Sequence, residues 1–220
     1  MANIHPSTYS EVAMSDTGMQ QPNARDIDVR PLRPQHRHRA IFEAYEQLVT
    51  GESMVVMTDQ EPEGLRKELD RELAGACRWK PLPSADDAYR VRLTKLASTA
   101  LPRVVANTRK LGEATDPATG GSIWRLEPGA RDLDSNIIAL PAGDEIALHA
   151  GPSLDVLILV LRGSGELHTE LDVIALQQGN LIWLPKYAQR RFVAGPDGMQ
   201  YLTVHQRKPT LNITAAPDRS

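Results

Sequence analysis

A group of imidazoles and cations opens the helix that we predict over residues 35–49. The run from His36 to Arg39 reads His-Arg-His-Arg. Histidines two positions apart point to different faces of a helix and chelate a metal poorly, whereas in an extended segment they share a face. The helix dipole disfavours cations at this end of a helix. His36 and His38 therefore form either a solvated polar segment or a site for an anion or a partner, which Asp59 could share.

Nucleotide-binding and nucleophile motifs are absent from the sequence. The chain has no Gly-x-x-x-x-Gly-Lys-Ser/Thr phosphate loop and no Gly-x-Gly-x-x-Gly after a strand. Gly163-Ser164-Gly165 falls in a predicted hairpin, not in the strand-to-helix turn of a nucleophile elbow. The single cysteine, Cys77, excludes an internal disulfide framework and a cysteine-based zinc site, and it fits a reducing, cytoplasmic compartment.

The balance of charge also excludes some classes of partner. With 25 basic and 28 acidic side chains, the formal net charge is -3. This chain lacks the strong uniform field that binds nucleic acid or an anionic membrane. Its longest apolar run, Val156 to Leu161, is far shorter than the roughly 20 residues of a spanning helix. The first residues do not show the basic and apolar regions of a signal peptide. We therefore expect no nucleic-acid or membrane partner.

The elements that must position these residues change in kind half-way along the chain. Residues 1–25 lack a periodic pattern and are predicted to be a disordered tail, in which Met14 is an alternative start. Residues 26–95 combine strand and helix patterns and predict a two-layer α+β domain. In the order strand, helix, strand, helix, strand, strand, its predicted elements are residues 26–30, 35–49, 53–58, 62–74, 78–80 and 89–93.

A turn-rich segment separates this domain from the remainder of the chain. Residues 96–121 are predicted to be a linker, with a helical pattern over 101–111. From residue 122 to 208, short β-rich runs are separated by Gly or Pro, which predicts a sandwich or a barrel. The polar residues 209–220 are predicted to be a second tail.

The spacing of the second half resembles two motifs of the cupins, a family of small jelly-roll barrels. The first motif sets Gly, His-x-His, Glu and Gly at fixed distances, and the second sets Gly, Pro-x-Gly, His and Asn. The positions that correspond to the first motif are Gly143, His149, Gly151, Asp155 or Val156, and Gly163. The positions that correspond to the second motif are Gly179, Pro185, Tyr187, Arg190 and Ala194. The resemblance implies an all-β jelly-roll barrel in which most metal-ligand positions hold other residues.

The cupin resemblance also implies where a ligand would lie. A metal-dependent cupin with an atypical ligand set would hold Fe, Mn, Ni or Zn on His149, Asp155 and His205. Arg190 argues against a metal, because a guanidinium has no lone pair to give and repels a divalent cation. It fits instead a pocket for a small organic anion, shared with those three residues, since Arg binds carboxylate or phosphate through a planar fork. In the competing interpretation, Arg190 points outward or pairs with Asp155.

The first half resembles the SirA/TusA-like domains of unknown function that occur beside cupins in bacteria. The matching segments are Asp28-Val29-Arg30-Pro31-Leu32, His36-Arg37-His38 with Phe42, Gly51-Glu52-Ser53, and Asp59 with Pro62. Sulfur carriers of this fold have Cys-Pro at the start of the first helix. This chain has Pro34-Gln35 there, and its thiol lies on a late strand. A persulfide relay needs an exposed, activated thiolate, so we do not expect sulfur transfer.

These observations leave three functions open. The one we favour is a non-enzymatic sensing or regulatory protein, bacterial and cytoplasmic, whose cupin domain binds a small organic anion without a metal. The alternatives are a metal-dependent cupin enzyme of the dioxygenase or isomerase type and a scaffold or interaction protein. The cupin resemblance implies a homodimer, for which the unpaired strand edges of a small barrel supply a physical reason.

Overall fold

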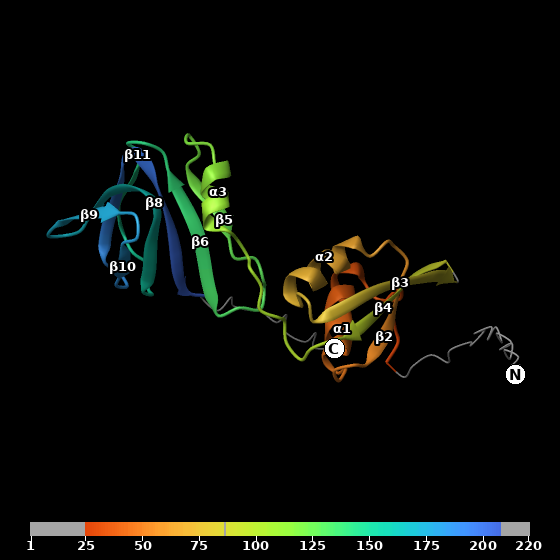
Figure 1. The fold of residues 1–220 in the computed structure, drawn as a ribbon. Coiled ribbons are helices and arrows are strands. Elements are labelled where there is room, and N and C mark those ends of the chain that lie inside the picture. The colour runs from red at the N-terminus through yellow and green to blue at the C-terminus, as the bar shows by residue number, and fades with distance from the viewer. Residues whose placement is uncertain (1–24, 86, 208–220) are drawn as a thin grey trace, which may run out of the picture. The chain divides into compact units, whose positions relative to one another are not determined.

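The structure is a computed structural model that describes residues 25–85 and 87–207. The chain divides after Ala100 into two compact units, and Figure 1 shows the elements of each. Apart from Arg25, the tails predicted at residues 1–25 and 209–220 lie outside the described residues. Within the described ranges, no helix has both the length and the apolar character needed to cross a bilayer.

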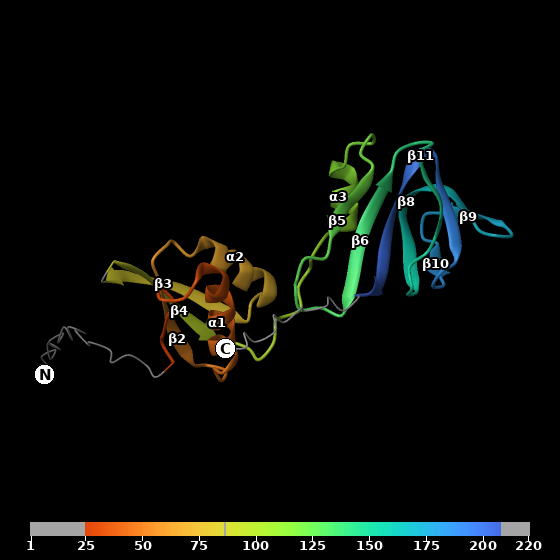
Figure 2. The same ribbon diagram turned by 180° about the vertical axis from the view of Figure 1, so that it is seen from behind.

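The first unit is a four-stranded sheet with two helices on one face (Figure 2). Its elements are β1 (Ile27–Asp28), α1 (Pro34–Glu46), β2 (Ser53–Thr58), α2 (Glu63–Glu72), β3 (Cys77–Ala85) and β4 (Ala88–Lys95). The strand order is β1-β2-β4-β3, with β1 parallel to β2 and the other pairs antiparallel. This succession of strands and helices is the predicted one, although α1 ends earlier than the helical spacing indicates.

Local sequence explains where α1 begins and which face of it is buried. Pro34 lies in the first turn, where its fixed φ suits the helix and its missing N–H costs no helical bond. Ile41 and Tyr45, one turn apart, are buried. Together with Leu65 and Leu69 of α2 they pack on one face of the sheet. The sheet residues in this core are Val29, Met54, Val56, Val91 and Leu93. Core residues alternate with other residues along β2 and β4, so the intervening side chains point to the opposite face. Both helices pack on the core face, and the opposite face carries no helix.

The second unit consists of one short helix and seven strands. Its elements are α3 (Thr108–Ala114), β5 (Gly121–Arg125), β6 (Leu133–Leu140), β7 (Glu145–Ala150), β8 (Val156–His168), β9 (Val173–Gln177), β10 (Leu181–Leu184) and β11 (Gln189–Gln206). The helix α3 lies in the segment predicted as a linker, but it begins later than residue 101. The side chain of Asn107 caps it by accepting a hydrogen bond from the backbone N–H of Lys110.

Two long strands, β8 and β11, run through the whole second unit. The first half of β8 pairs with β10 and its second half with β9, while β11 pairs first with β7 and then with β6. The strand path runs β10-β8-β11-β6-β5, with β7 and β9 attached as branches. In the described part of the chain the strands therefore form open sheets. The closed barrel that the cupin resemblance implied is not formed by these pairs.

A glycine contact allows β8 and β11 to cross closely where their register shifts. The shift lies between Ala194 and Met199 of β11, opposite Gly163 to Gly165 of β8. Gly163 has a φ of +73°, and a Cβ at this position would overlap the carbonyl oxygen of Gly198. Only glycine combines this backbone conformation with so close an approach.

The apolar core of the second unit lies on one face of these strands. Alternate residues of β8 and of the first part of β11 point into it, as the two-residue period of a strand requires. The buried members of this core are Leu140, Val156, Ile158, Val160, Leu167, Leu176, Leu184, Phe192, Ala194, Met199 and Tyr201. The same alternation carries the side chain two positions before Phe192 into the interior, and that residue is Arg190.

Candidate anion site

Arg190 is the charged residue that the second unit buries. It lies at the start of β11, two and four positions before the buried Phe192 and Ala194, and only 4% of it is exposed. Its cross-strand partner on β7 is His149. The strand period thus decides the direction of this side chain, and the interpretation in which Arg190 points outward is wrong.

The guanidinium of Arg190 is incompletely paired. Its Nε donates to the carbonyl oxygen of Ala188 at 3.3 Å, a long hydrogen bond to its own strand. Its Nη2 is buried and has no hydrogen-bond partner among the described residues. No carboxylate in the described ranges forms an ion pair with it, so the predicted alternative of a pair with Asp155 is not formed. Burial lowers the pKa of Arg190, because the interior disfavours its charge.

Gly151 makes room for this guanidinium. A Cβ at position 151 would overlap Nη2 of Arg190 and lie close to its Cζ and Nε. The backbone N–H of Gly151 donates to the carbonyl oxygen of Ala188, which also accepts from Arg190. Gly151 corresponds to the second histidine of the cupin motif. Arg190 therefore fills the space into which a side chain at that motif position would project.

An aromatic pair adjoins the buried cation. Phe192 and Tyr201 stack with their ring centroids 5.3 Å apart and an interplanar angle of 15°. Tyr201 is 4% exposed, and burial raises the pKa of its hydroxyl to about 12. The positive charge of Arg190 partly offsets this rise in pKa, which places the phenol within electrostatic reach of the guanidinium. The interior thus offers a cation, a neutral hydroxyl and apolar walls.

The other residues predicted for this site make contacts of their own. His149 is exposed, and its Nδ1 lies 2.8 Å from the carbonyl oxygen of Ala147. Asp155 is exposed and accepts a hydrogen bond of 2.9 Å from the backbone N–H of Lys186, which ties two loops together. The Nδ1 of His205 lies 3.0 Å from the carbonyl oxygen of Gln206. Asp155 and His205 therefore contact the backbone at separate places, whereas His149 is the register neighbour of Arg190 on β7.

This donor set does not fit a divalent metal. Such an ion needs three or four N or O ligands that converge on one point. Across residues 25–85 and 87–207, no group of three His, Cys, Asp or Glu side chains is arranged to hold one. The motif position opposite His149 is filled by a permanent cation that has no lone pair. A divalent metal ion would therefore find too few ligands beside Arg190.

The cluster predicted in the first unit is divided between two ion pairs. Asp59 accepts from Nη1 and Nη2 of Arg37 at 2.5 and 2.9 Å, a bidentate pair that lowers the pKa of Asp59 and raises the pKa of Arg37. His38 lies 2.5 Å from Glu68 and so joins α1 to α2. His36 is exposed. The structure therefore does not bring His36, His38 and Asp59 together as one site.

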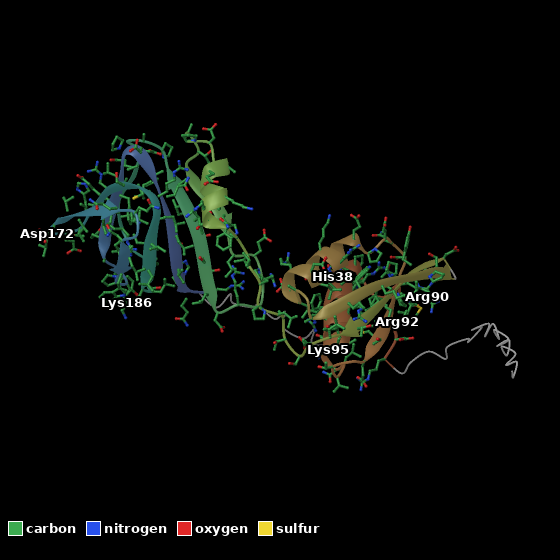
Figure 3. All side chains as sticks on the ribbon, in the orientation of Figure 1. His38, Arg90, Arg92, Lys95, Asp172 and Lys186 are labelled. Atoms are coloured by element: carbon green, nitrogen blue, oxygen red, sulfur yellow. The ribbon has the colours of Figure 1, made fainter. Side chains whose placement is uncertain are left out.

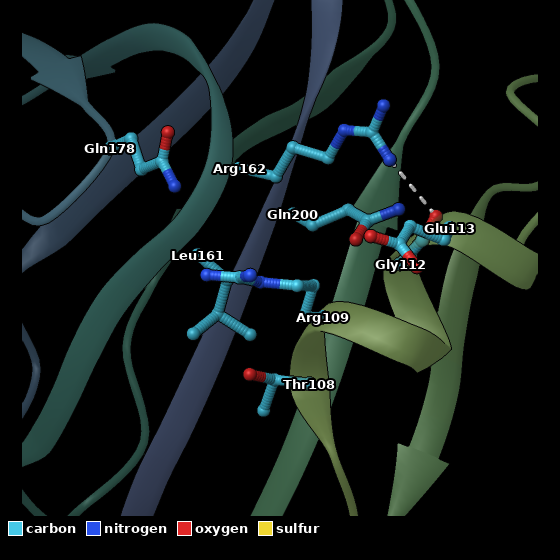
Figure 4. A pocket seen from close by; sticks show the side chains of 8 residues that line it. All are labelled: Thr108, Arg109, Gly112, Glu113, Leu161, Arg162, Gln178 and Gln200. Carbon is cyan, nitrogen blue, oxygen red and sulfur yellow. Dashed lines mark hydrogen bonds between the residues drawn. The ribbon is translucent and has the colours of Figure 1, made fainter.

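A polar cavity in the second unit was not predicted. It has a volume of about 510 Å³ and lies between α3 and the strands β8 and β11 (Figure 4). Its lining residues are Thr108, Arg109, Gly112, Glu113, Leu161, Arg162, Gln178 and Gln200. Arg162 donates to the carbonyl oxygen of Gly112 at 3.1 Å, and Gly112 lets α3 approach Gln200 closely. The sequence offers no motif for this cavity, because α3 and the strands that form it are far apart along the chain.

Comparisons with known proteins separate the two halves of the chain. Residues 26–95 match the family model described as "Uncharacterized conserved protein (DUF2249)". No curated protein matches the sequence. Among solved structures, the chain is similar to the SPY1581 protein from Streptococcus pyogenes, with 23% identity, 39% of this chain and 73% of that chain covered, and a TM-score of 0.34. A cupin-2 domain containing protein from Shewanella frigidimarina is 19% identical. That match covers 47% of this chain and 95% of the Shewanella protein, with a TM-score of 0.37.

A third solved structure matches a similar share of the chain. KdgF from Halomonas sp. is 20% identical, and the match covers 39% of this chain and 77% of that chain with a TM-score of 0.34. Further structural neighbours are also cupin proteins, among them one from Bacteroides fragilis. The SirA/TusA resemblance of the first half stays a prediction. The chain is thus similar to the DUF2249 family over residues 26–95, and it has cupin-2 domain proteins among its structural neighbours.

Proposed function

We propose that the second unit is a cupin-type sensing module that binds a small organic anion on Arg190 without a metal and without catalysing a reaction. The observation that carries this proposal is the buried Nη2 atom that has no partner among the described residues. A buried donor without a partner costs about 1–3 kcal/mol, and more when the group is charged. An anionic ligand would recover that cost, because it supplies both the missing acceptor and the opposite charge.

The surroundings of Arg190 support a carboxylate as the ligand. A carboxylate accepts hydrogen bonds from a guanidinium in a planar arrangement, and the hydroxyl of Tyr201 can donate a further one. Phe192 and the remainder of the core would contact an apolar body attached to that carboxylate. The ligand class that this chemistry selects is a small monocarboxylate with an apolar substituent.

The same chemistry supports binding rather than catalysis. Arg190 stays protonated and therefore cannot act as a general base or as a nucleophile. Glu145, the carboxylate across the sheet from this segment, is paired with Arg191 instead. The metal-dependent enzyme that we held as an alternative needs His149, Asp155 and His205 to converge, and each of these side chains lies at a separate backbone contact.

We further propose that a second copy of the chain is a partner of this unit. Leu157 is opposite Trp183 and Leu159 is opposite Leu181 on the outer face of β8 and β10. Trp183 is 60% exposed and Leu181 is 67% exposed. A contiguous apolar patch of this kind marks an interaction site, and a two-fold axis would let it cover itself. Light scattering should give the mass of a dimer, and Trp183→Glu should give a monomer.

The anion proposal is tested by thermal unfolding with a panel of small anions. The panel contains acetate, propionate, benzoate and inorganic phosphate, each added to the full-length protein and to Arg190→Met. A ligand that binds only the folded state raises Tm with its concentration. We expect propionate or benzoate to raise Tm of the wild type and to leave that of Arg190→Met unchanged. The matched control is Arg191→Met, which removes the neighbouring exposed cation and should keep the response.

If none of these anions raises Tm of the wild type, or if Arg190→Met responds equally, the proposed site is refuted. A response to a divalent metal at one equivalent, lost in His149→Ala, would favour the enzyme alternative instead. The interaction-protein alternative predicts a partner whose binding survives both substitutions.

A further inference from the structure

The face of the first sheet that carries no helix has an unusual distribution of charge. Met54, Val56, Val91 and Leu93 belong to the core that the sheet shares with α1 and α2. The residues between them in the sequence point to the other side, because side chains alternate along a strand. We call this surface the basic face, and its members on β2, β3 and β4 are Ser53, Val55, Met57, Arg78, Lys80, Leu82, Arg90, Arg92 and Thr94.

Four cations lie on the basic face at neighbouring register positions. Lys80 is directly opposite Arg92, Arg90 is opposite Leu82, and Arg78 is opposite Thr94. Figure 3 labels Arg90 and Arg92 on this unit. The members on β2, β3 and β4 include no acidic residue. Asp28 of β1 lies at the edge of the same face. Its Oδ2 forms an ion pair with Nη2 of Arg30 at 2.7 Å.

The cations of the basic face have few partners of their own. Arg78, Lys80 and Arg90 form no ion pair among residues 25–85 and 87–207. Several acidic side chains of the unit pair with other cations, as in Arg37–Asp59 and Arg25–Glu52. Like charges directly opposite each other destabilise a sheet. Arg78, Lys80 and Arg90 therefore lack an acidic partner in the described part of the chain, and an acidic ligand would supply one.

The apolar members of the face indicate what kind of molecule binds. Met57 of β2 and Leu82 of β3 are half-buried on either side of Arg90, whereas Val55 is already buried with 8% exposed. The face has no aromatic residue, whereas single-stranded nucleic acids are held mainly by stacking of bases on aromatic rings. A second copy of this face would bring cations against cations. A protein segment that carries both carboxylates and apolar side chains matches the charge and the apolar centre.

We propose that the basic face is a docking surface for an acidic segment of a partner protein. Its carboxylates would pair with Arg78, Lys80 and Arg90, and its apolar side chains would cover Met57 and Leu82. This function is separate from anion binding by Arg190, because the two surfaces belong to different units.

The test measures fluorescence anisotropy of a labelled 16-residue peptide built from Glu-Glu-Val repeats, titrated with the full-length protein at low salt. The variant Lys80→Glu/Arg90→Glu reverses two charges of the basic face. The matched control, Arg33→Glu/Arg39→Glu, makes the same change in net charge at exposed positions of α1, on the face of the sheet that the helices cover. Thermal unfolding of each variant verifies that the unit is folded.

We expect the basic-face variant to bind the peptide about tenfold more weakly and the α1 control to bind within about threefold of the wild type, because the pairs are local and the net charge is equal. Equal losses in both variants would overturn the proposal, since the attraction would then be a matter of net charge alone. The labelled oligonucleotide dT16 is the competing probe. Tighter binding of dT16 than of the peptide, lost in the basic-face variant, would also overturn the proposal in favour of nucleic acid.

Discussion

Replacing Arg190 with methionine should make the ligand-free protein more stable. The substitution removes a charge and the unpaired Nη2 from the interior, while the side chain of methionine fills much of the same apolar space. An unsatisfied buried donor costs about 1–3 kcal/mol, and replacing a buried charged group by an apolar one of similar shape is often neutral or stabilising. The hydrogen bond to Ala188 that is lost is long and contributes little. We therefore expect the free energy of unfolding to rise by about 1–3 kcal/mol.

The assay for this prediction is calorimetric and urea-induced unfolding of the second unit, in a buffer without carboxylate or phosphate. A gain of 1 kcal/mol corresponds to about 4 °C in Tm for a domain of this size. The control, Arg191→Met, loses an exposed pair with Glu145 and should change stability by less than about 1 kcal/mol. A loss of stability in Arg190→Met greater than that of the control would refute the reasoning, because the guanidinium would then be a structural group.

Three further predictions concern the same interior. Gly151→Ala should cost about 1–3 kcal/mol because its Cβ overlaps the guanidinium, and urea unfolding of the double variant should show this cost relieved by Arg190→Met. Gly163→Ala should cost about 3 kcal/mol or more in the same assay, because its positive φ and the contact with Gly198 both oppose a side chain. Folding raises the pKa of Tyr201 from 10.0 to about 12. Its contribution to stability is therefore complete below pH 10 and lost as the pH rises towards 12. Tyr201→Phe should lessen this alkaline loss, which circular dichroism and tyrosinate absorbance measure.

Some of the site could be predicted from sequence because its signals are local. The motif spacing singled out both Arg190 and Gly151, since turns fix the distances between successive strands. The burial of Arg190 then follows from its parity with Phe192 and Ala194. What the motif could not show is that the guanidinium lies against Gly151 and has no carboxylate partner among the described residues, because that depends on a contact between two strands.

The remaining parts of the site depend on where side chains point and on how distant elements pack. The identity of a single residue does not reveal either. His149, Asp155 and His205 are polar residues of suitable type, but loop contacts such as the bond from Lys186 to Asp155 turn them away from one another. Likewise, the pairing of Asp59 with Arg37 rather than with a histidine depends on packing between α1 and the end of β2.

The fold shows the same division between local and distant signals. Alternation and helical spacing located the strands and helices of the first unit, because each pattern is complete within one element. The sequence did not reveal that β8 and β11 each pair with different strands along their two halves. It also did not reveal the register shift between Ala194 and Met199, because their partners on β8, Gly165 and Gly163, are distant in the sequence.

The measurement that tests the central claim most directly is the NMR signal of the Arg190 Nε–H during titration with propionate. Burial slows exchange of this proton with water, and comparison with Arg190→Met assigns its resonance. We predict that the resonance shifts and saturates with propionate while the resonances of exposed arginines move little. A resonance that does not move, or one that follows the exposed arginines without saturating, would contradict the assignment of Arg190 as an anion-binding residue.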